Sequence, residues 1–244
     1  MRQEQLSNQL ADRIVNHCHK IPFKEIVHPN IAERKLRSRR CLVALAGGPG
    51  SGKSTIAASI SAAVAERGVK CQAISIEGFM KPKKELNDNM MKRRGAIETF
   101  DGEAAVELLK KMRQLGPGHE IRAPTFDEDK GEPVPSSQTI EADSETVIFE
   151  GIYLLADQEP WKQMESLVDE KWFIHVRPEL SRERVVGRRI DKGMHQDKEE
   201  AYKVYDESDG LNNDFIAKHR YHTDVIIEAN EEFAIKEPNG KEHK

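Results

Sequence analysis

The sequence has 244 residues, a formal net charge of −4 and 33% charged residues. Its length fits one α/β domain with a large core, and its weak net charge argues against nucleic acid or a membrane surface as a partner. No apolar stretch approaches the roughly 18 residues of a membrane span, and the N-terminus lacks the apolar segment of a secretion signal, so we expect a cytoplasmic protein. The three cysteines, Cys18, Cys41 and Cys71, form no C-x-x-C pair and are expected to be reduced packing thiols.

The first predicted element is an amphipathic helix over residues 4–17, in which Leu6, Leu10 and Ile14 recur at helical spacing. We expect residues 1–38 to form a helical extension that braces the outside of the molecule. The main domain is then expected at residues 39–230 and a polar tail at residues 231–244, disordered beyond Glu237.

The most specific signal is the pattern Gly47-x-x-x-x-Gly52-Lys53-Ser54, which follows a short apolar run and precedes a helical pattern. Such a loop wraps closely enough for its backbone N–H groups to bind the phosphates of a nucleoside triphosphate. The lysine adds a positive charge, and the Ser54 hydroxyl is a ligand for Mg²⁺. The predicted nucleotide-binding residues are Gly47, Gly48, Pro49, Gly50, Ser51, Gly52, Lys53, Ser54 and Thr55.

Strands and helices alternate through the rest of the chain. Strands are expected at residues 42–46, 71–76, 146–149, 172–176 and 224–227, the last closing the sheet; helices are expected after the loop, from Asp101 to about Leu115, from Pro178 and over 197–219. Between them, residues 81–94 are basic and aperiodic, which indicates a mobile excursion, and residues 119–143 are expected to form an extended loop or a hairpin. This order predicts an α/β fold with a parallel sheet covered by helices on both faces.

Acidic residues follow two of the predicted strands, at Glu77 and Glu150. Parallel strands end at one edge of a sheet, so we expect both acids to converge there with the loop at Gly47–Ser54. Glu150 is the candidate magnesium ligand beside Ser54, and Glu77 is the candidate base that takes a proton from an acceptor hydroxyl. The alternative for each is a solvated acid at a strand end.

A helix that begins at Pro178 carries four arginines, of which Arg184 and Arg188 share a face. It follows the fourth strand of the predicted sheet, where a helix can fold over the phosphates as a lid. We therefore predict that Lys53, Arg184 and Arg188 act on the transferred phosphoryl group, although charged helix faces are more often merely solvated.

The ordered set of motifs resembles the superfamily of phosphoribulokinase, uridine kinase and bacterial-type pantothenate kinase. The resemblance covers about residues 40–228 and is closest to fungal and bacterial members of unassigned substrate. It rests on the loop, on Ser75–Phe79, Arg93–Asp101, Pro124–Asp127, Ile148–Leu155 with Trp161, the arginine helix, and Asn212–Asp214. It implies a P-loop NTPase sandwich with a lid helix and substrate-side insertions, which transfers the γ-phosphoryl group of ATP, with Mg²⁺, to a hydroxyl of a small metabolite.

The resemblance also gives candidate acceptor contacts at Phe79, Arg94, Asp127 and Tyr153. Most members have Asp-Gly-Phe followed by His or a similar group, whereas this chain has Glu77-Gly78-Phe79-Met80. Glutamate extends the carboxylate by one methylene, and proton transfer is sensitive to such a displacement.

The chemistry of the acceptor stays open at this point. The basic residues 81–94 favour an anionic acceptor unless they are a solvated loop, whereas Asp127, Glu128 and Asp129 favour sugar hydroxyls. An ATP-binding switch or assembly factor with slow hydrolysis is the alternative to a kinase, and Glu77 and Met80 favour it. The chain has no Asn-Lys-x-Asp segment for guanine, and its sequence does not decide between a monomer and a homodimer.

Overall fold

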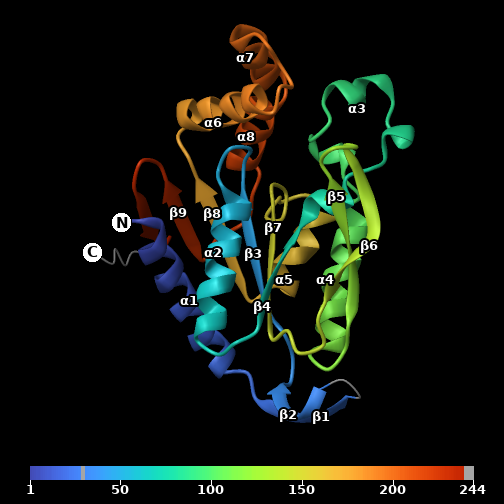
Figure 1. The fold of residues 1–244 in the computed structure, drawn as a ribbon, viewed down its shortest axis with the longest axis vertical. Coiled ribbons are helices and arrows are strands. Elements are labelled where there is room, and N and C mark those ends of the chain that lie inside the picture. Colours follow the sequence, from blue (N-terminus) through green and yellow to red (C-terminus); the bar gives the residue numbers. More distant parts are fainter. Residues whose placement is uncertain (29–30, 239–244) are drawn as a thin grey trace.

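The computed structural model describes residues 1–28 and 31–238, with side chains 25–34 outside the description. A six-stranded sheet forms its centre, in the spatial order β10-β9-β8-β3-β7-β4 (Figure 1). The strands in chain order are β3 (Cys41–Gly47), β4 (Cys71–Ser75), β7 (Thr146–Gly151), β8 (Glu170–His175), β9 (Val225–Ala229) and β10 (Phe233–Lys236). All adjacent pairs are parallel except β9–β10, so the parallel sheet expected from the alternating pattern is confirmed.

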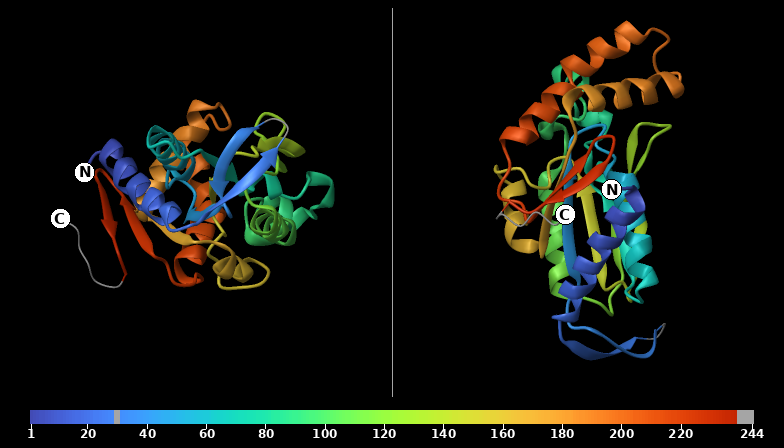
Figure 2. Two further views of the ribbon diagram at one scale, coloured as in Figure 1. Left: turned by 90° about the horizontal axis from the view of Figure 1, so that it is seen from below. Right: turned by 90° about the vertical axis from the view of Figure 1, so that its left-hand side faces the viewer.

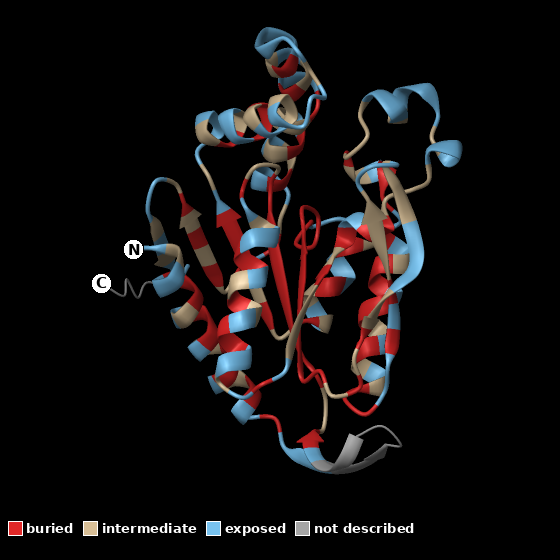
Figure 3. Ribbon diagram, viewed as in Figure 1, coloured by how far each residue is buried: buried red, intermediate tan, exposed pale blue. Residues whose placement is uncertain are grey.

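Helices cover both faces of the sheet, which gives three layers (Figure 2). On one face lie α1 (Gln3–His19) and α2 (Lys53–Glu66); on the other lie α4 (Gly102–Leu115), the short α5 (Met164–Leu167) and part of α8 (Asp209–Lys218). Successive side chains of β3 point to opposite faces of the sheet. Leu42 and Ala44 pack in the core on the α4 side, whereas Val43 and Leu45 pack in the core on the α1 side. The central strands are therefore buried on both faces (Figure 3).

Local signals in the sequence set several element boundaries. The Asp101 side chain accepts a hydrogen bond from the Ala104 amide at 2.9 Å and so begins α4, and Gly116 ends it with φ +63°. The amphipathic helix predicted at residues 4–17 is confirmed as α1, which packs on α2 through Leu6, Leu10 and their neighbours.

Two hairpins extend from the sandwich, β1 (Phe23–His28) with β2 (Ile31–Arg37), and β5 (Ile121–Asp127) with β6 (Glu132–Ile140).

A helical cap lies beyond the carboxyl ends of the strands (Figure 1). It consists of α6 (Pro178–Asp191), α7 (Lys198–Glu207) and α8. The segment of residues 76–99, with η1 (Ile76–Phe79), η2 (Lys83–Glu85), α3 (Asp88–Lys92) and η3 (Ile97–Thr99), lies on the other side of the same edge. The last short element, η4 (Trp161–Gln163), precedes α5.

Three expectations need correction. The single helix expected over residues 197–219 is broken at Ser208, whose φ of −134° and ψ of −74° are not helical, so that α7 and α8 are separate helices. Strand β9 is not the last strand of the sheet, because β10 pairs with it. Strand β10 lies in residues 231–244, which were expected to form a polar tail. Residues 1–38 contain a hairpin as well as a helix. The expected disorder beyond Glu237 falls mostly on residues 239–244, outside the described residues.

Among the described residues, no helix is long and apolar enough to cross a membrane.

Candidate active site

A cavity of about 420 Å³ lies at the carboxyl edge of the sheet, between the phosphate-binding loop and the helical cap. The loop, the segment after β4 and the end of β7 all contribute to its wall, so chemically distinct segments converge as the strand order led us to expect. The lining residues are Pro49, Gly50, Gly52, Lys53, Ser54, Thr55, Ile76, Glu77, Met80, Arg94, Gly95, Phe100, Gly151, Ile152, Arg184, Val185, Arg188, Asp209 and Asn212.

The loop between β3 and α2 has the backbone that its glycines permit. Gly50 and Gly52 have φ of +76° and +82°, a left-handed conformation that other residues rarely adopt. Lys53 is the first residue of α2, and its Nζ donates a hydrogen bond to the Gly48 carbonyl at 3.1 Å. The free N–H groups and the positive dipole end of α2 thus face the cavity beside a lysine, an arrangement suited to an anion such as a polyphosphate.

A pair of oxygen ligands lies next to the lysine. The Ser54 hydroxyl donates to Glu150 Oε1 at 3.0 Å, and only 4% of Glu150 is exposed at the end of β7. A hydroxyl and a carboxylate are hard oxygen donors of the kind that Mg²⁺ prefers. The donor chemistry therefore fits a magnesium ion bound together with phosphate oxygens.

Glu77 lies in η1, immediately after β4, where the Ser75 hydroxyl accepts a hydrogen bond from its amide at 3.3 Å. Loss of water around its carboxylate raises the pKa of Glu77, the negative charge of Glu150 raises it further, and the charges of Lys53 and Arg188 oppose both effects. A carboxylate with a raised pKa in a cavity is suited to accept a proton.

Burial lowers the pKa of Lys53, against the opposing effect of the charges on Glu150 and Glu77. The charges of Glu150 and Arg188 thus act on the ionisation of both Lys53 and Glu77, which also act on each other. These four side chains come from α2, η1, β7 and α6, and only the fold brings them together.

The two arginines predicted to contact phosphate have different surroundings. Arg184 donates to three backbone carbonyls, those of Gly50 at 3.3 Å, Ala229 at 3.1 Å and Asn230 at 3.2 Å, so it joins the loop to the end of β9. The Arg188 guanidinium makes no hydrogen bond or ion pair within the described chain and lines the cavity. Arg188 is therefore the arginine with donors free for a ligand.

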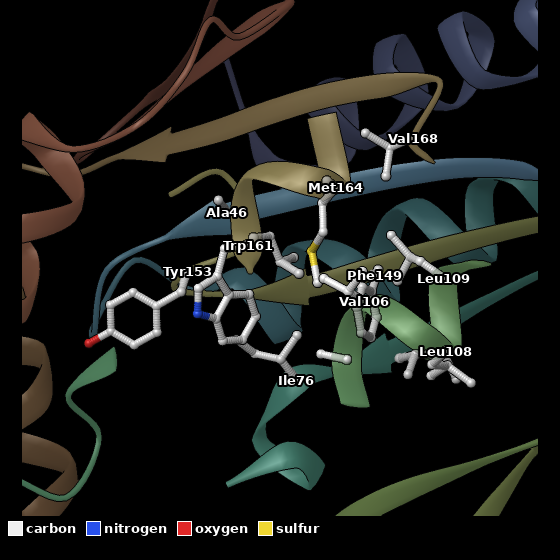
Figure 4. Packing of buried hydrophobic residues seen from close by; sticks show 14 of the residues in the cluster. Ala46, Ile76, Val106, Leu108, Leu109, Phe149, Tyr153, Trp161, Met164 and Val168 are labelled. Carbon is white, nitrogen blue, oxygen red and sulfur yellow. The ribbon is translucent and has the colours of Figure 1, made fainter. Parts of the chain in front are cut away.

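The candidate acceptor contacts are only partly at the cavity. Arg94 lines it, but its guanidinium also donates to the carbonyls of Gly131 and Lys81. Phe79 and Tyr153 lie in the core on the α4 side, where Phe79 packs edge-on against Phe149 and the Tyr153 hydroxyl donates to the Gly95 carbonyl. Figure 4 shows the Tyr153 ring beside Trp161 in this core. None of Phe79, Tyr153 and Asp127 lines the cavity.

Asp127 instead organises the turn of the β5–β6 hairpin, where it accepts from the Lys130 amide at 3.0 Å. The neighbouring Glu128 contacts Lys192 at the end of α6, which joins the hairpin turn to the helical cap.

Most cations of residues 81–94 do not point into the cavity. Lys81 donates to the Glu98 carbonyl at 3.0 Å, Lys83 to the Lys130 carbonyl at 2.6 Å, and Arg93 to Asn212 Oδ1 at 3.5 Å. Of the six cations, only Arg94 lines the cavity. This weakens the argument for an anionic acceptor that their number suggested.

Several wall residues were not among the site residues predicted from the sequence, although all except Asp209 lie in or next to the quoted motifs. An apolar side is formed by Ile76, Met80, Phe100 and Ile152, and Asp209 and Asn212 come from the start of α8. The break at Ser208 places Asp209 at a helix start rather than inside a helix, so no signal from periodicity could have identified it. Asp209 pairs with Arg189 at 2.6 Å, and burial raises its pKa.

A second cluster lies at the amino ends of β3 and β8, where His17, Cys41 and Asp169 approach one another. Asp169 pairs with Arg39 at 2.6 Å and with Arg113 at 2.8 Å. Two guanidinium groups on one carboxylate disfavour an added cation, so the cluster is an ion-pair network at the edge of the core.

Comparison with known proteins gives consistent matches over most of the chain. A sequence model of the Phosphoribulokinase / Uridine kinase family matches residues 42–236. The protein named "Putative uridine kinase C227.14" from Schizosaccharomyces pombe is 35% identical over 197 residues, which cover 78% of this chain and 83% of that protein. YggC from Escherichia coli is 31% identical over 198 residues, 80% of each chain. The crystal structure of YFH7 from Saccharomyces cerevisiae has a TM-score of 0.75 and 18% identity, and the match covers 95% of this chain and 100% of that one, which shows a shared fold.

Proposed function

This chain belongs to the phosphoribulokinase/uridine kinase family of P-loop kinases, and we propose that it transfers the γ-phosphoryl group of ATP to a hydroxyl group of a small metabolite. The observation that carries the proposal is the convergence of Lys53, Ser54, Glu77 and Arg188 on one cavity. An anion site, oxygen ligands for a metal, a proton acceptor and a free guanidinium are the parts that phosphoryl transfer requires.

In this proposal the loop and the start of α2 bind the triphosphate through backbone N–H groups, and Lys53 contacts its terminal phosphates. Ser54 and Glu150 would hold Mg²⁺, and a bound magnesium ion would supply positive charge to neutralise the phosphate oxygens. The Arg188 guanidinium stabilises charge on the transferred group. Arg184 acts indirectly, because its guanidinium donates to the Gly50 carbonyl and so holds the loop in place.

Glu77 takes the proton from the acceptor hydroxyl as the acceptor oxygen attacks the γ-phosphorus, and ADP leaves. The cavity wall also includes the apolar side chains of Met80, Phe100 and Ile152, and the polar side chains of Asp209 and Asn212 on α8. We assign this part of the wall to the acceptor, which would meet one apolar side and a few polar groups.

The test is an ADP-release assay with MgATP and a panel of alcohols: uridine, cytidine, pantothenate, other ribosides, sugars and sugar acids. We expect at least one acceptor to stimulate ADP release, with a phosphorylated product detected by mass spectrometry. Tight MgATP binding without stimulation by any compound would contradict the proposal.

The second candidate is an ATP-binding switch that hydrolyses ATP slowly and acts on a partner protein. It is favoured by Met80, which places a thioether rather than a hydrogen-bonding group on the wall next to Glu77. A partner that co-purifies with the protein only in the presence of ATP, together with no acceptor-stimulated turnover, would support it.

A further inference from the structure

Three polar side chains meet inside the helical cap, one from each of its helices. The Ser181 hydroxyl of α6 lies 3.0 Å from the Tyr205 hydroxyl of α7, and Asn213 Nδ2 of α8 donates to both, at 3.0 Å and 2.9 Å. Ser181 and Tyr205 are only 2% and 4% exposed. We call Ser181, Tyr205 and Asn213 the cap triad.

The cap triad is directed at the phosphate-binding loop. Ser181 donates to the Pro49 carbonyl at 2.6 Å, and Asn213 Nδ2 approaches the same oxygen at 3.4 Å. One assignment of hydrogens uses every donor: Ser181 donates to Pro49, Tyr205 donates to Ser181, and the Asn213 amide donates to Tyr205 and Ser181. A buried network in which every donor has an acceptor favours a single geometry.

The carbonyl that the cap triad holds controls the direction of a loop N–H group. In a planar trans peptide the C=O and the next N–H point in opposite directions. Holding the Pro49 carbonyl toward Ser181 therefore turns the Gly50 N–H away from α6. The flanking carbonyls are held too, because Lys53 donates to Gly48 and Arg184 donates to Gly50.

Packing supports the same conclusion. A Cβ atom on Gly48 would lie 1.4 Å from Asn213 Oδ1, and one on Gly50 would lie 2.7 Å from the Ser181 carbonyl. The absence of a side chain at these two positions therefore allows the loop to lie this close to the cap.

The cap triad is also connected, through α8, to the cavity wall. Asn213 follows Asn212 on α8, and α8 begins with Asp209; both Asn212 and Asp209 line the cavity. The loop and that wall are thus joined through one buried network.

We propose that Ser181, Tyr205 and Asn213 are positioning residues, which hold the phosphate-binding loop in its nucleotide-binding shape before nucleotide arrives and link it to α8. The nucleotide part of this inference rests on the proposed function. The part that concerns the preorganised loop does not rest on the proposed function, because it describes the protein without nucleotide.

The experiment compares Tyr205→Phe with Tyr202→Phe. Both variants lose one hydroxyl from α7, but Tyr202 contacts the exposed Glu183 outside the cap triad. Since one buried hydrogen bond contributes about a factor of five to ten in an equilibrium, we expect Tyr205→Phe to speed amide hydrogen exchange at residues 50–54 about five- to tenfold without nucleotide. The Kd for MgATP should rise by a similar factor. Tyr202→Phe should change neither.

A double-mutant cycle adds Asn213→Ala to Tyr205→Phe. If the two residues act through one network, the effects on loop exchange will be less than additive. Wild-type exchange in Tyr205→Phe, or faster exchange spread equally over the central strands, would overturn the inference. If the wild-type protein itself binds no MgATP, the proposed function fails, whereas the exchange comparison still tests the cap triad.

Discussion

Replacing Gly48 by alanine tests the close contact between the loop and the cap. The added methyl would lie 1.4 Å from Asn213 Oδ1 and 2.6 Å from its Cγ, whereas real Cβ atoms essentially never lie closer than 3.0 Å to such a neighbour. Gly48 is not among the glycines with positive φ, so alanine meets no backbone penalty and the effect isolates the clash.

The magnitude follows from what the clash displaces. Asn213 must leave its contacts with Tyr205 and Ser181, each worth about 1 kcal/mol, or the loop must shift at the usual cost of overpacking, about 1–3 kcal/mol. We expect the free energy of unfolding to fall by about 2–3 kcal/mol and the Kd for MgATP to rise at least tenfold.

Urea unfolding measures the first quantity and calorimetric titration with MgATP the second. Gly187→Ala is the matched control, because that glycine lies on α6 with nothing within 4 Å of an added Cβ; the variant should be neutral or up to about 1 kcal/mol more stable. Adding Asn213→Ala to Gly48→Ala clears the space and should recover part of the MgATP affinity. Wild-type affinity and stability in Gly48→Ala would refute this account of the loop.

Three further predictions concern the proposed chemistry. Lys53→Ala should abolish MgATP binding or turnover, measured by titration and ADP release; retained turnover would mean that the loop is not used as proposed. Glu77→Gln should lower the turnover rate about 10²–10⁴-fold with little change in ATP affinity. Because the pKa of Glu77 is raised and the base must be ionised, wild-type turnover should fall as the pH drops through a pKa above that of an ordinary glutamate, and this limb should vanish in Glu77→Gln. Glu150→Gln should raise the Mg²⁺ concentration needed for half-maximal turnover, and an unchanged requirement would place the metal elsewhere.

Interactions between near neighbours in the chain could be predicted from the sequence. The spacing of Gly47, Gly52 and Lys53 specifies the loop because one turn and one helix start contain all of its parts. Asp101 and Gly116 bound α4 for the same reason. The convergence of Glu77 and Glu150 on the loop followed from a topological rule, that parallel strands end at one edge.

The positions of individual side chains at the cavity depended on contacts between distant segments. Arg184 and Arg188 are equivalent on the helix face, but only Arg184 finds the carbonyls of Ala229 and Asn230, which belong to a strand end about 45 residues later. Tyr153 was predicted to contact the acceptor because of the motif in which it lies. In the structure its ring packs against the rings of Phe100, Trp161 and Phe215 instead.

The sequence by itself thus determined the phosphate-binding loop, the order of strands and helices, and the edge of the sheet where the chemistry lies, since these depend on local spacing and chain order. Only the tertiary structure decided which cations face the cavity, where the cap breaks at Ser208, and how Ser181, Tyr205 and Asn213 meet the Pro49 carbonyl. The physical reason is that a buried polar group is satisfied by whichever partner packing brings within about 3 Å, and local sequence does not specify that partner.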